Sequence, residues 1–299
     1  MEPADPRIVE AAAATLGTMP VAWRRVSGGY TQAERWIATL EGGPSAFVKA
    51  GLTQETASWL RDEYRIYGAV HAPFLADVLG WHDLAPDAAV LILEDLSAWT
   101  WPPPWRPGNV ERVLATLDHV RLTSPPQGLP ALESYRELLT RWDLVAADPA
   151  PFLTLGKCTA SWLEASLPVL IDAEKRASLA GTDLLHLDVR SDNVCFSGDR
   201  TVLVDWNWAC TGNADVDVGA WLCTLPSEGV DMRPWEVLPD KPGIAALLSG
   251  YFAYWSGMPP PETADPAVRG LQQRTLDALL EWVVRELDLP PLRRGTIRS

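Results

Sequence analysis

The stretch from His186 to Asp205, HLDVRSDNVCFSGDRTVLVD, constrains the fold of this chain more than any other feature. Asp188 lies two residues after His186, Asn193 lies five residues after Asp188, and Asp205 ends a short apolar run. This spacing predicts a loop followed by a short β-hairpin. Such a unit can hold three oxygen-bearing side chains on one rigid base.

These residue types fit the requirements of phosphoryl transfer to a hydroxyl group. That reaction needs an Asp that accepts or orients the hydroxyl proton, and an Asn and a second Asp that hold magnesium against the phosphates. The pattern H-x-D-x-x-x-x-N, followed closely by an apolar strand and an Asp, is specific. A lone Asp or Asn in such a loop would instead indicate a turn residue.

Composition narrows the class of protein. The chain has 299 residues, of which 47% are hydrophobic and 21% charged, so a globular fold is expected. It shows no basic leader followed by an apolar run and no apolar segment of membrane-spanning length, which predicts a soluble, cytoplasmic protein. The net charge of −14 argues against nucleic acid or an anionic membrane as a partner.

The cysteines and histidines give no sign of a metal or disulfide framework. The four cysteines lack C-x-x-C spacing, and the four histidines lie far apart without zinc-ligand spacing. We expect small buried thiols and no structural zinc.

The first third of the chain predicts a small antiparallel sheet. Apolar periodicity and glycine-bearing turns indicate a helix at 6–16, strands at 22–26, 34–40 and 46–50, a helix at 53–70, and strands at 78–81 and 89–94. After Leu96, the sequence WPPPW at 101–105 predicts a rigid connector. Helical patterns then follow at 110–122, 131–146, 159–180, 216–224, 241–256 and 266–286.

The predicted fold class is therefore α+β, with two lobes. Residues 1–96 would form an N-terminal, sheet-containing lobe for nucleotide binding. Residues 97–299 would form a mostly helical lobe for catalysis and for binding the acceptor. The loop and hairpin at 181–206 lie in the second of these ranges.

The turn between the first two strands is a candidate phosphate-binding loop. It contains Gly28, Gly29, Tyr30 and Thr31, and its glycines would let backbone N–H groups approach phosphates. An ordinary hairpin turn explains the same residues, because the full G-x-G-x-x-G motif is absent.

Lys49 is the only lysine before Lys157 and ends an apolar strand. Its ammonium could hold the α- and β-phosphates of a nucleotide, although an exposed edge lysine would look the same in sequence. A helical glutamate should then pair with it. Glu63 and Glu55 are both candidates, and Glu63 is favoured because it lies mid-helix.

The strand at 89–94 runs into Glu94, Asp95 and Leu96. A strand exit of this kind can present backbone N–H and C=O groups to a purine base, which makes Glu94 and Leu96 candidate nucleotide contacts. A plain strand-to-loop exit accounts for them equally well.

Taken together, these motifs resemble the aminoglycoside phosphotransferase family of the protein-kinase-like superfamily. The resemblance covers nearly the whole chain and is strongest at residues 186–193, 203–206 and 212–222. It implies a two-lobed protein-kinase-like fold and ATP or GTP as cofactor with Mg²⁺. The sequence departs from the family at Leu187, where the family usually has Gly.

The resemblance also assigns roles to residues. It implies that Asp188 is the catalytic Asp and that Asn193 and Asp205 hold magnesium. It further implies that Lys49 and Glu63 form the phosphate-orienting ion pair. Asp217 resembles the family's Asp after the metal site, with a structural role.

Arg190 lies two residues after Asp188 and could neutralise the phosphoryl group in transfer. A surface ion pair with Asp192 is an equal alternative. Only eleven residues separate Asp205 from Asp217, which leaves no room for a long activation segment or a peptide platform. We therefore expect a small-molecule acceptor.

Residues 181–240 carry eleven acidic and three basic residues, a net charge of −8. This excess could attract a cationic or amine-bearing acceptor, although a solvated acidic face would show the same composition. The candidate acceptor contacts are Glu228, Asp231 and Glu236, with Trp221 or Trp235 as an apolar or cation–π wall.

The leading functional hypothesis is an ATP-dependent small-molecule phosphotransferase. The main alternative is a nucleotide-binding pseudoenzyme that acts as a scaffold or sensor, and retention of Asp188, Asn193 and Asp205 together argues against it. An interaction protein with an incidental motif is a third class, which would not bind ATP.

Overall fold

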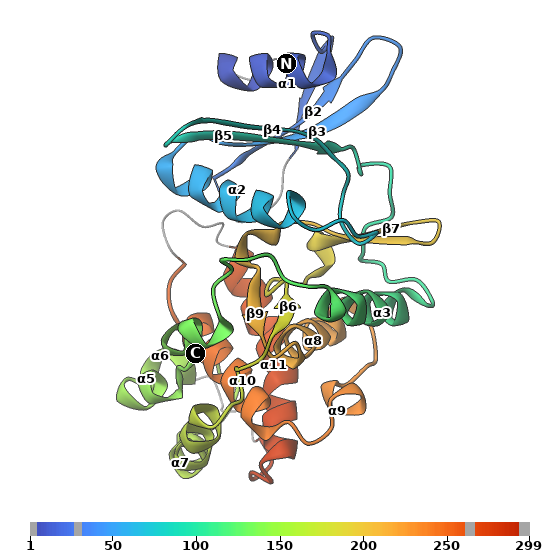
Figure 1. Ribbon diagram of the computed structural model, residues 1–299. Coiled ribbons are helices and arrows are strands. Elements are labelled where there is room, and N and C mark those ends of the chain that lie inside the picture. Colours follow the sequence, from blue (N-terminus) through green and yellow to red (C-terminus); the bar gives the residue numbers. More distant parts are fainter. Residues whose placement is uncertain (1–4, 27–31, 261–266, 293–299) are drawn as a thin grey trace. The chain divides into compact units, whose positions relative to one another are not determined.

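The structure, a computed structural model, describes residues 5–26, 32–260 and 267–292 (Figure 1). The chain forms two compact units. The first comprises Met1–Pro103, Pro125–Gly128 and Arg190–Ala209, and the second comprises Pro104–Ser124, Leu129–Val189 and Cys210–Ser299. The first unit therefore includes the hairpin segment, which lies far along the chain from the sheet.

The first unit is built on a five-stranded antiparallel sheet with the order β1-β2-β3-β5-β4. Its strands are β1 (Ala22–Arg25), β2 (Glu34–Thr39), β3 (Ser45–Gly51), β4 (Val78–Ala85) and β5 (Ala88–Glu94). Helix α1 (Pro6–Leu16) covers one face and helix α2 (Gln54–Tyr67) covers the other (Figure 1). The predicted small antiparallel sheet is confirmed.

The two helices of this unit begin and end where the sequence provides caps. The Asp5 side chain accepts the backbone N–H of Arg7 at the start of α1, and Gly17 ends it with φ 71°. Thr53 and Thr56 form a capping box at the start of α2.

Alternation along β3 decides which side chains face each helix. Ala46, Val48 and Ala50 are buried in the core that α1 completes, with Trp23, Trp36 and Ile92. Phe47 and Lys49 therefore lie on the opposite face, the one that α2 covers. A Cβ at Gly51 would lie 2.5 Å from the backbone of Thr56, so glycine allows α2 to begin close against the strand.

The hairpin of β7 (Val194–Ser197) and β8 (Arg200–Leu203) belongs to the same unit. Short 3₁₀ turns flank it at Ser191–Asn193 and Trp206–Trp208. Leu203 donates its N–H to the carbonyl of Phe74 at 2.9 Å, and Arg200 pairs with Glu94 at 2.8 Å. These contacts attach the hairpin beside the end of β5.

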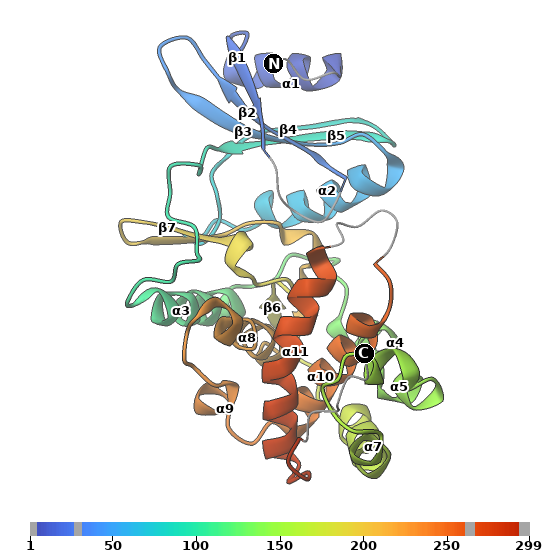
Figure 2. The same cartoon turned by 180° about the vertical axis from the view of Figure 1, so that it is seen from behind.

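The second unit is mostly helical, as predicted. Its α-helices are α3 (Asn109–Leu122), α4 (Arg136–Leu139), α5 (Trp142–Ala147), α6 (Ala150–Leu153), α7 (Ala160–Lys175), α8 (Asp215–Leu222), α9 (Pro234–Val237), α10 (Pro242–Gly257) and α11 (Ala267–Glu286). Helix α10 packs against α11, α7 and α5 and forms the centre of the core (Figure 2). Strands β6 (Asp183–Leu185) and β9 (Cys210–Gly212) make a two-stranded ladder within this unit.

One predicted element of the second unit is wrong. The helix expected at 131–146 is divided into a 3₁₀ turn at Leu132–Tyr135 and the short helices α4 and α5. The buried Glu174 carboxylate accepts the backbone N–H of Arg141 at 2.6 Å and that of Trp142 at 3.1 Å. Two backbone N–H groups that a continuous helix would use are thereby bound to this carboxyl group, and a new helix starts at this point.

All four cysteines are free and buried. Within the described ranges, no helix is long and apolar enough to cross a membrane.

Candidate functional site

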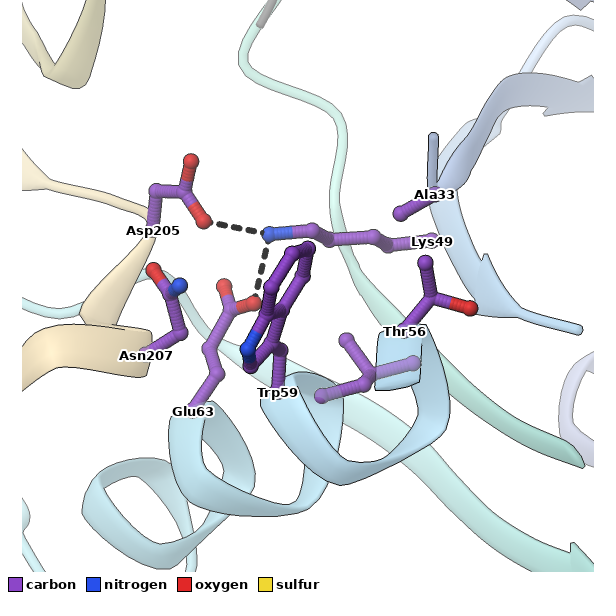
Figure 3. A pocket seen from close by; sticks show the side chains of 8 residues that line it. Ala33, Lys49, Thr56, Trp59, Glu63, Asp205 and Asn207 are labelled. Carbon is purple, nitrogen blue, oxygen red and sulfur yellow. Dashed lines mark hydrogen bonds and ion pairs between the residues drawn. The ribbon is translucent and has the colours of Figure 1, made fainter. Parts of the chain in front are cut away.

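A buried lysine between two carboxylates is the central feature of the first unit. Lys49 on β3 is 7% exposed, and its Nζ lies 2.6 Å from Glu63 Oε2 and 2.6 Å from Asp205 Oδ1 (Figure 3). Glu63 comes from the middle of α2 and is 2% exposed. One sheet, one helix and one hairpin thus contribute one charge each to the cluster.

This geometry shows which of the two candidate glutamates pairs with Lys49. Glu55 lies in the first turn of α2 and is exposed, whereas Glu63 contacts Lys49. The phosphate-orienting role of the Lys49–Glu63 pair stays a prediction.

The charged groups of this cluster keep one another ionised. Burial lowers the pKa of Lys49, but the neighbouring Asp205 and Glu63 carboxylates outweigh it, so the pKa is raised and the ammonium stays charged. Burial raises the pKa of Asp205, but the Lys49 charge outweighs it and brings the pKa to about 2. The carboxylate of Asp205 is therefore ionised at any physiological pH.

Asp205 and Asn193 lie at the base of the hairpin. Val204 donates its N–H to the carbonyl of Asn193 at 3.0 Å, which fixes the two ends of the hairpin together. Asp205 has φ 70°, in the left-handed region that Asp tolerates better than most residues. When its amide nitrogen faces Asp205, Asn207 donates to Asp205 Oδ1 and to the Asp205 backbone carbonyl, both at 3.2 Å. Asn207 was not singled out from the sequence.

A pocket of about 420 Å³ opens beside this cluster, entirely within the first unit. That volume falls in the usual range for small-molecule sites. Its lining combines apolar side chains with charged and amide groups. The pocket is lined by Arg24, Val26, Arg35, Ile37, Phe47, Lys49, Glu63, Leu93, Glu94, Asp95, Leu96, Ser97, Trp101, Asp192, Asn193, Val204 and Asp205.

Glu94 and Leu96, the candidate nucleotide contacts, line this pocket, and several of their polar groups already have protein partners. The Glu94 carboxylate binds Arg200 and accepts the N–H of Asp77, and its own N–H donates to the Asp77 carbonyl. The Leu96 carbonyl accepts Trp99 N–H and Trp101 Nε1, both at 3.0 Å. The sequence showed Trp101 only as part of a proline-rich connector and gave no sign of this contact.

The candidate phosphate loop cannot be compared with the prediction. Gly28, Gly29, Tyr30 and Thr31 lie outside the described residues. Next to them, Val26 donates its N–H to the Arg35 carbonyl at 2.9 Å, so the pairing of β1 with β2 extends to the edge of this turn.

In the second unit, a buried Asp217 holds the loop that carries Asp188. Its carboxylate accepts the backbone N–H of His186 at 2.6 Å and of Leu187 at 2.7 Å. Burial raises the pKa of Asp217 to about 7, although these two hydrogen bonds act in the opposite direction. Asp188 is half-buried, and its N–H donates to His186 Nδ1 at 3.2 Å.

Leu187 has a backbone conformation that favours glycine. Its φ is 62°, a conformation in which an L side chain costs on the order of 1 kcal/mol. The two N–H bonds to Asp217 hold the backbone in this turn despite that cost.

Comparison with known proteins supports the fold. No family model and no curated protein matches the chain. Among solved structures, a thermostable mutant of the aminoglycoside phosphotransferase APH(4)-Ia matches with a TM-score of 0.60 and 15% identity, covering 92% of this chain and 99% of that one. Spectinomycin phosphotransferase APH(9)-Ia, in complex with ADP and spectinomycin, matches with a TM-score of 0.59 and 13% identity, covering 96% and 100%. Choline kinase LicA from Streptococcus pneumoniae gives 0.56 and 14%, covering 92% and 98%.

The chain has the fold of these small-molecule kinases. The predicted α+β, kinase-like fold class is thereby confirmed.

Asn193 and Asp205 fit a magnesium ion that is shared with phosphates. Mg²⁺ usually takes one or two carboxylates from the protein and fills its other positions with phosphate oxygens and water. Asp205 supplies an ionised carboxylate and Asn193 a buried side-chain amide. The described residues contain no cluster of three or more His, Cys, Asp or Glu side chains that would make an all-protein metal site.

Arg190 pairs with Asp192, with Nε 2.9 Å from Oδ1, so the surface ion pair considered from the sequence is present. The charge of Arg190 also contributes, after that of Lys49 and Arg35, to lowering the pKa of Asp205. A role in phosphoryl transfer stays a prediction.

The five acceptor candidates each have a structural partner in the second unit. Glu228 accepts Trp105 Nε1 at 2.6 Å, and Trp221 is fully buried with its ring 6.0 Å from that of Trp105. Asp231 is 93% exposed and pairs with Arg233. Glu236 accepts the N–H of Arg233 at the start of α9, and Trp235 lies under Arg285 at 5.2 Å. The burial of Trp221 argues against its ring as an acceptor wall.

Replacing Lys49 by Met should destabilise the protein in a pH-dependent way. In the wild type, the low pKa of Asp205 means that its stabilisation is complete above about pH 4 and is lost as the pH falls through 2. Without the ammonium, the buried Glu63 carboxylate and the half-buried Asp205 carboxylate lack their cation, and their ionisation opposes folding. We expect a loss of about 3 kcal/mol or more at pH 8 and a smaller loss at pH 5, measured by urea unfolding.

Lys157→Met is the matched control, because the Lys157–Asp277 pair is solvent-exposed on the Asp277 side. It should cost less than about 1 kcal/mol at either pH. Equal losses for Lys49→Met at pH 5 and pH 8 would contradict the assignment of charges.

Asp217→Asn should loosen the loop that carries Asp188. An amide has one acceptor oxygen, so one of the two backbone N–H groups would face a donor instead. We expect a loss of about 1–3 kcal/mol in the free energy of unfolding. Asp215→Asn, two residues earlier in α8, removes only a half-exposed pair with Lys241 and should cost less than about 1 kcal/mol. Equal effects of the two variants would refute the role of Asp217.

Proposed function

We propose that this chain is a phosphotransferase that moves the γ-phosphate of ATP or GTP to a hydroxyl of a small, amine-bearing molecule. The observation that carries the proposal is the Lys49–Glu63–Asp205 cluster beside a pocket whose lining also includes apolar side chains. A nucleotide has an apolar base and a charged phosphate chain, so a lining of both kinds suits it.

The site residues of the first unit have the following roles in this proposal. Lys49 holds the phosphates, and Glu63 keeps its ammonium in position. Asn193 and Asp205 would hold magnesium, which supplies charge neutralisation for the phosphates. Val26, Ile37 and Phe47, which line the pocket, provide the apolar surface for the base.

In the second unit, Asp188 orients the acceptor hydroxyl and takes its proton. Asp217 is a positioning residue, because it holds the backbone on the N-terminal side of Asp188. Arg190 is a candidate for charge stabilisation of the phosphoryl group once its pair with Asp192 opens.

A small-molecule acceptor is supported by the fold. Structures that share it are named as an aminoglycoside phosphotransferase, a spectinomycin phosphotransferase and a choline kinase. The preference for an amine-bearing acceptor rests on the net charge of −8 over residues 181–240.

Asp188→Asn tests the transfer reaction itself. Loss of the base should lower turnover by roughly two to four orders of magnitude and leave ATP affinity nearly intact. Turnover is followed by mass spectrometry of the phosphorylated acceptor, and ATP binding by calorimetry. Asp199→Asn, on the exposed tip of the hairpin, should behave as wild type. A wild-type protein that binds Mg-ATP but phosphorylates no acceptor would favour a pseudoenzyme.

A panel of hydroxyl-bearing amines and anions tests the acceptor class. Amine-bearing members should be the better substrates, and raising the salt concentration should weaken that preference. Glu228→Gln keeps the acceptor oxygen for Trp105 but removes a charge, so it should raise KM for the amine about fivefold and leave KM for ATP unchanged. An anionic best substrate would defeat this part of the proposal.

A further inference from the structure

Two cations lie side by side on the pocket face of the sheet. Arg35 on β2 is the direct cross-strand partner of Lys49 on β3. Directly opposed residues of an antiparallel pair point to the same face, with Cβ atoms about 5 Å apart. Both side chains line the 420 Å³ pocket, whereas the neighbouring pair, Trp36 and Val48, is buried in the core on the other face.

Charge balance shows why the second cation matters. The Lys49 ammonium faces two carboxylates, Glu63 and Asp205, so these three groups together carry a net charge of −1. Without the magnesium ion of the proposed function, that net charge would repel the phosphate chain of a nucleotide. Arg35 brings the net charge of the four protein groups to zero.

The chemistry of Arg35 suits phosphate. A guanidinium is planar, is always charged, and presents a fork of N–H groups that matches two phosphate oxygens. Arg35 Nη1 donates to the Ala33 carbonyl at 3.1 Å, a contact that orients the guanidinium. Ala33 itself lies beside Lys49 in the small cavity next to the pocket (Figure 3).

We propose that Arg35 is a second phosphate-binding cation, which grips the nucleotide's phosphate chain together with Lys49. This inference rests on the proposed function, because it assigns a further residue to the same nucleotide site. It extends the single-lysine arrangement that the sequence motifs indicated.

The chain offers a matched control on the same sheet. Arg25 ends β1 on the opposite face, where its guanidinium lies 5.7 Å from the centre of the Trp36 ring. Arg25→Gln removes the same charge from the same sheet but from outside the pocket.

The experiment compares ATP with adenosine, which lacks phosphates, as ligands of the wild type and of Arg35→Gln, Arg35→Lys and Arg25→Gln. Affinities are measured by isothermal titration calorimetry, with thermal unfolding as a check on folding. We expect Arg35→Gln to weaken ATP binding about tenfold to a hundredfold without changing the affinity for adenosine. Arg35→Lys should recover part of the loss, and Arg25→Gln should match the wild type.

The outcomes separate this inference from the proposed function. If the wild type binds ATP and Arg35→Gln binds it equally well, Arg35 has no phosphate role and the proposed function stands. If Arg35→Gln weakens ATP and adenosine equally, the residue is structural and the inference is overturned. If the wild type binds neither ATP nor GTP, both fail together.

Discussion

The burial of one lysine between two carboxylates is the interaction on which the first unit depends. Taking three charges out of water is costly unless each is paired. Lys49 is paired with Glu63 from α2 and with Asp205 from the end of the hairpin, at 2.6 Å in each case. Removing any one element would leave an unbalanced buried charge. The cluster therefore joins the sheet, the helix and residues 190–209, and it explains why a segment so distant in sequence packs in this unit.

The second unit uses a buried carboxylate in a different way. In the part of the chain that the structure describes, no cationic side chain pairs with Asp217, and its carboxylate accepts two backbone N–H groups, those of His186 and Leu187. Such an arrangement fixes a backbone path, including the positive φ of Leu187, rather than a set of charges. One carboxylate thus sets the electrostatics near the pocket, and the other sets the geometry of the loop that bears Asp188.

The sequence predicted the parts of the site that depend on local chain geometry. Asn193 and Asp205 lie at the base of one hairpin because only the hairpin separates them. Contacts between distant segments could not be predicted from the sequence. Glu174, more than thirty residues from Arg141 in sequence, accepts the Arg141 N–H where the helix expected at 131–146 is interrupted. The indole N–H of Trp101 donates to the Leu96 carbonyl. Arg35 could have been found by extending the alternation of β2, once its register with β3 was known.

In the proposed function, the hydrogen bonds that the Leu96 carbonyl already accepts limit how a purine base can be recognised. A carbonyl oxygen has two lone pairs, and that of Leu96 already accepts two donors, from Trp99 and Trp101. It is therefore saturated, and a purine amino group gains nothing there without displacing an indole. The apolar side chains of Ile37, Phe47 and Leu93, which every purine can contact, remain available to the base. In the proposed function, phosphate-binding cations add affinity through their charge, which gives the proximity of Lys49 and Arg35 its physical importance.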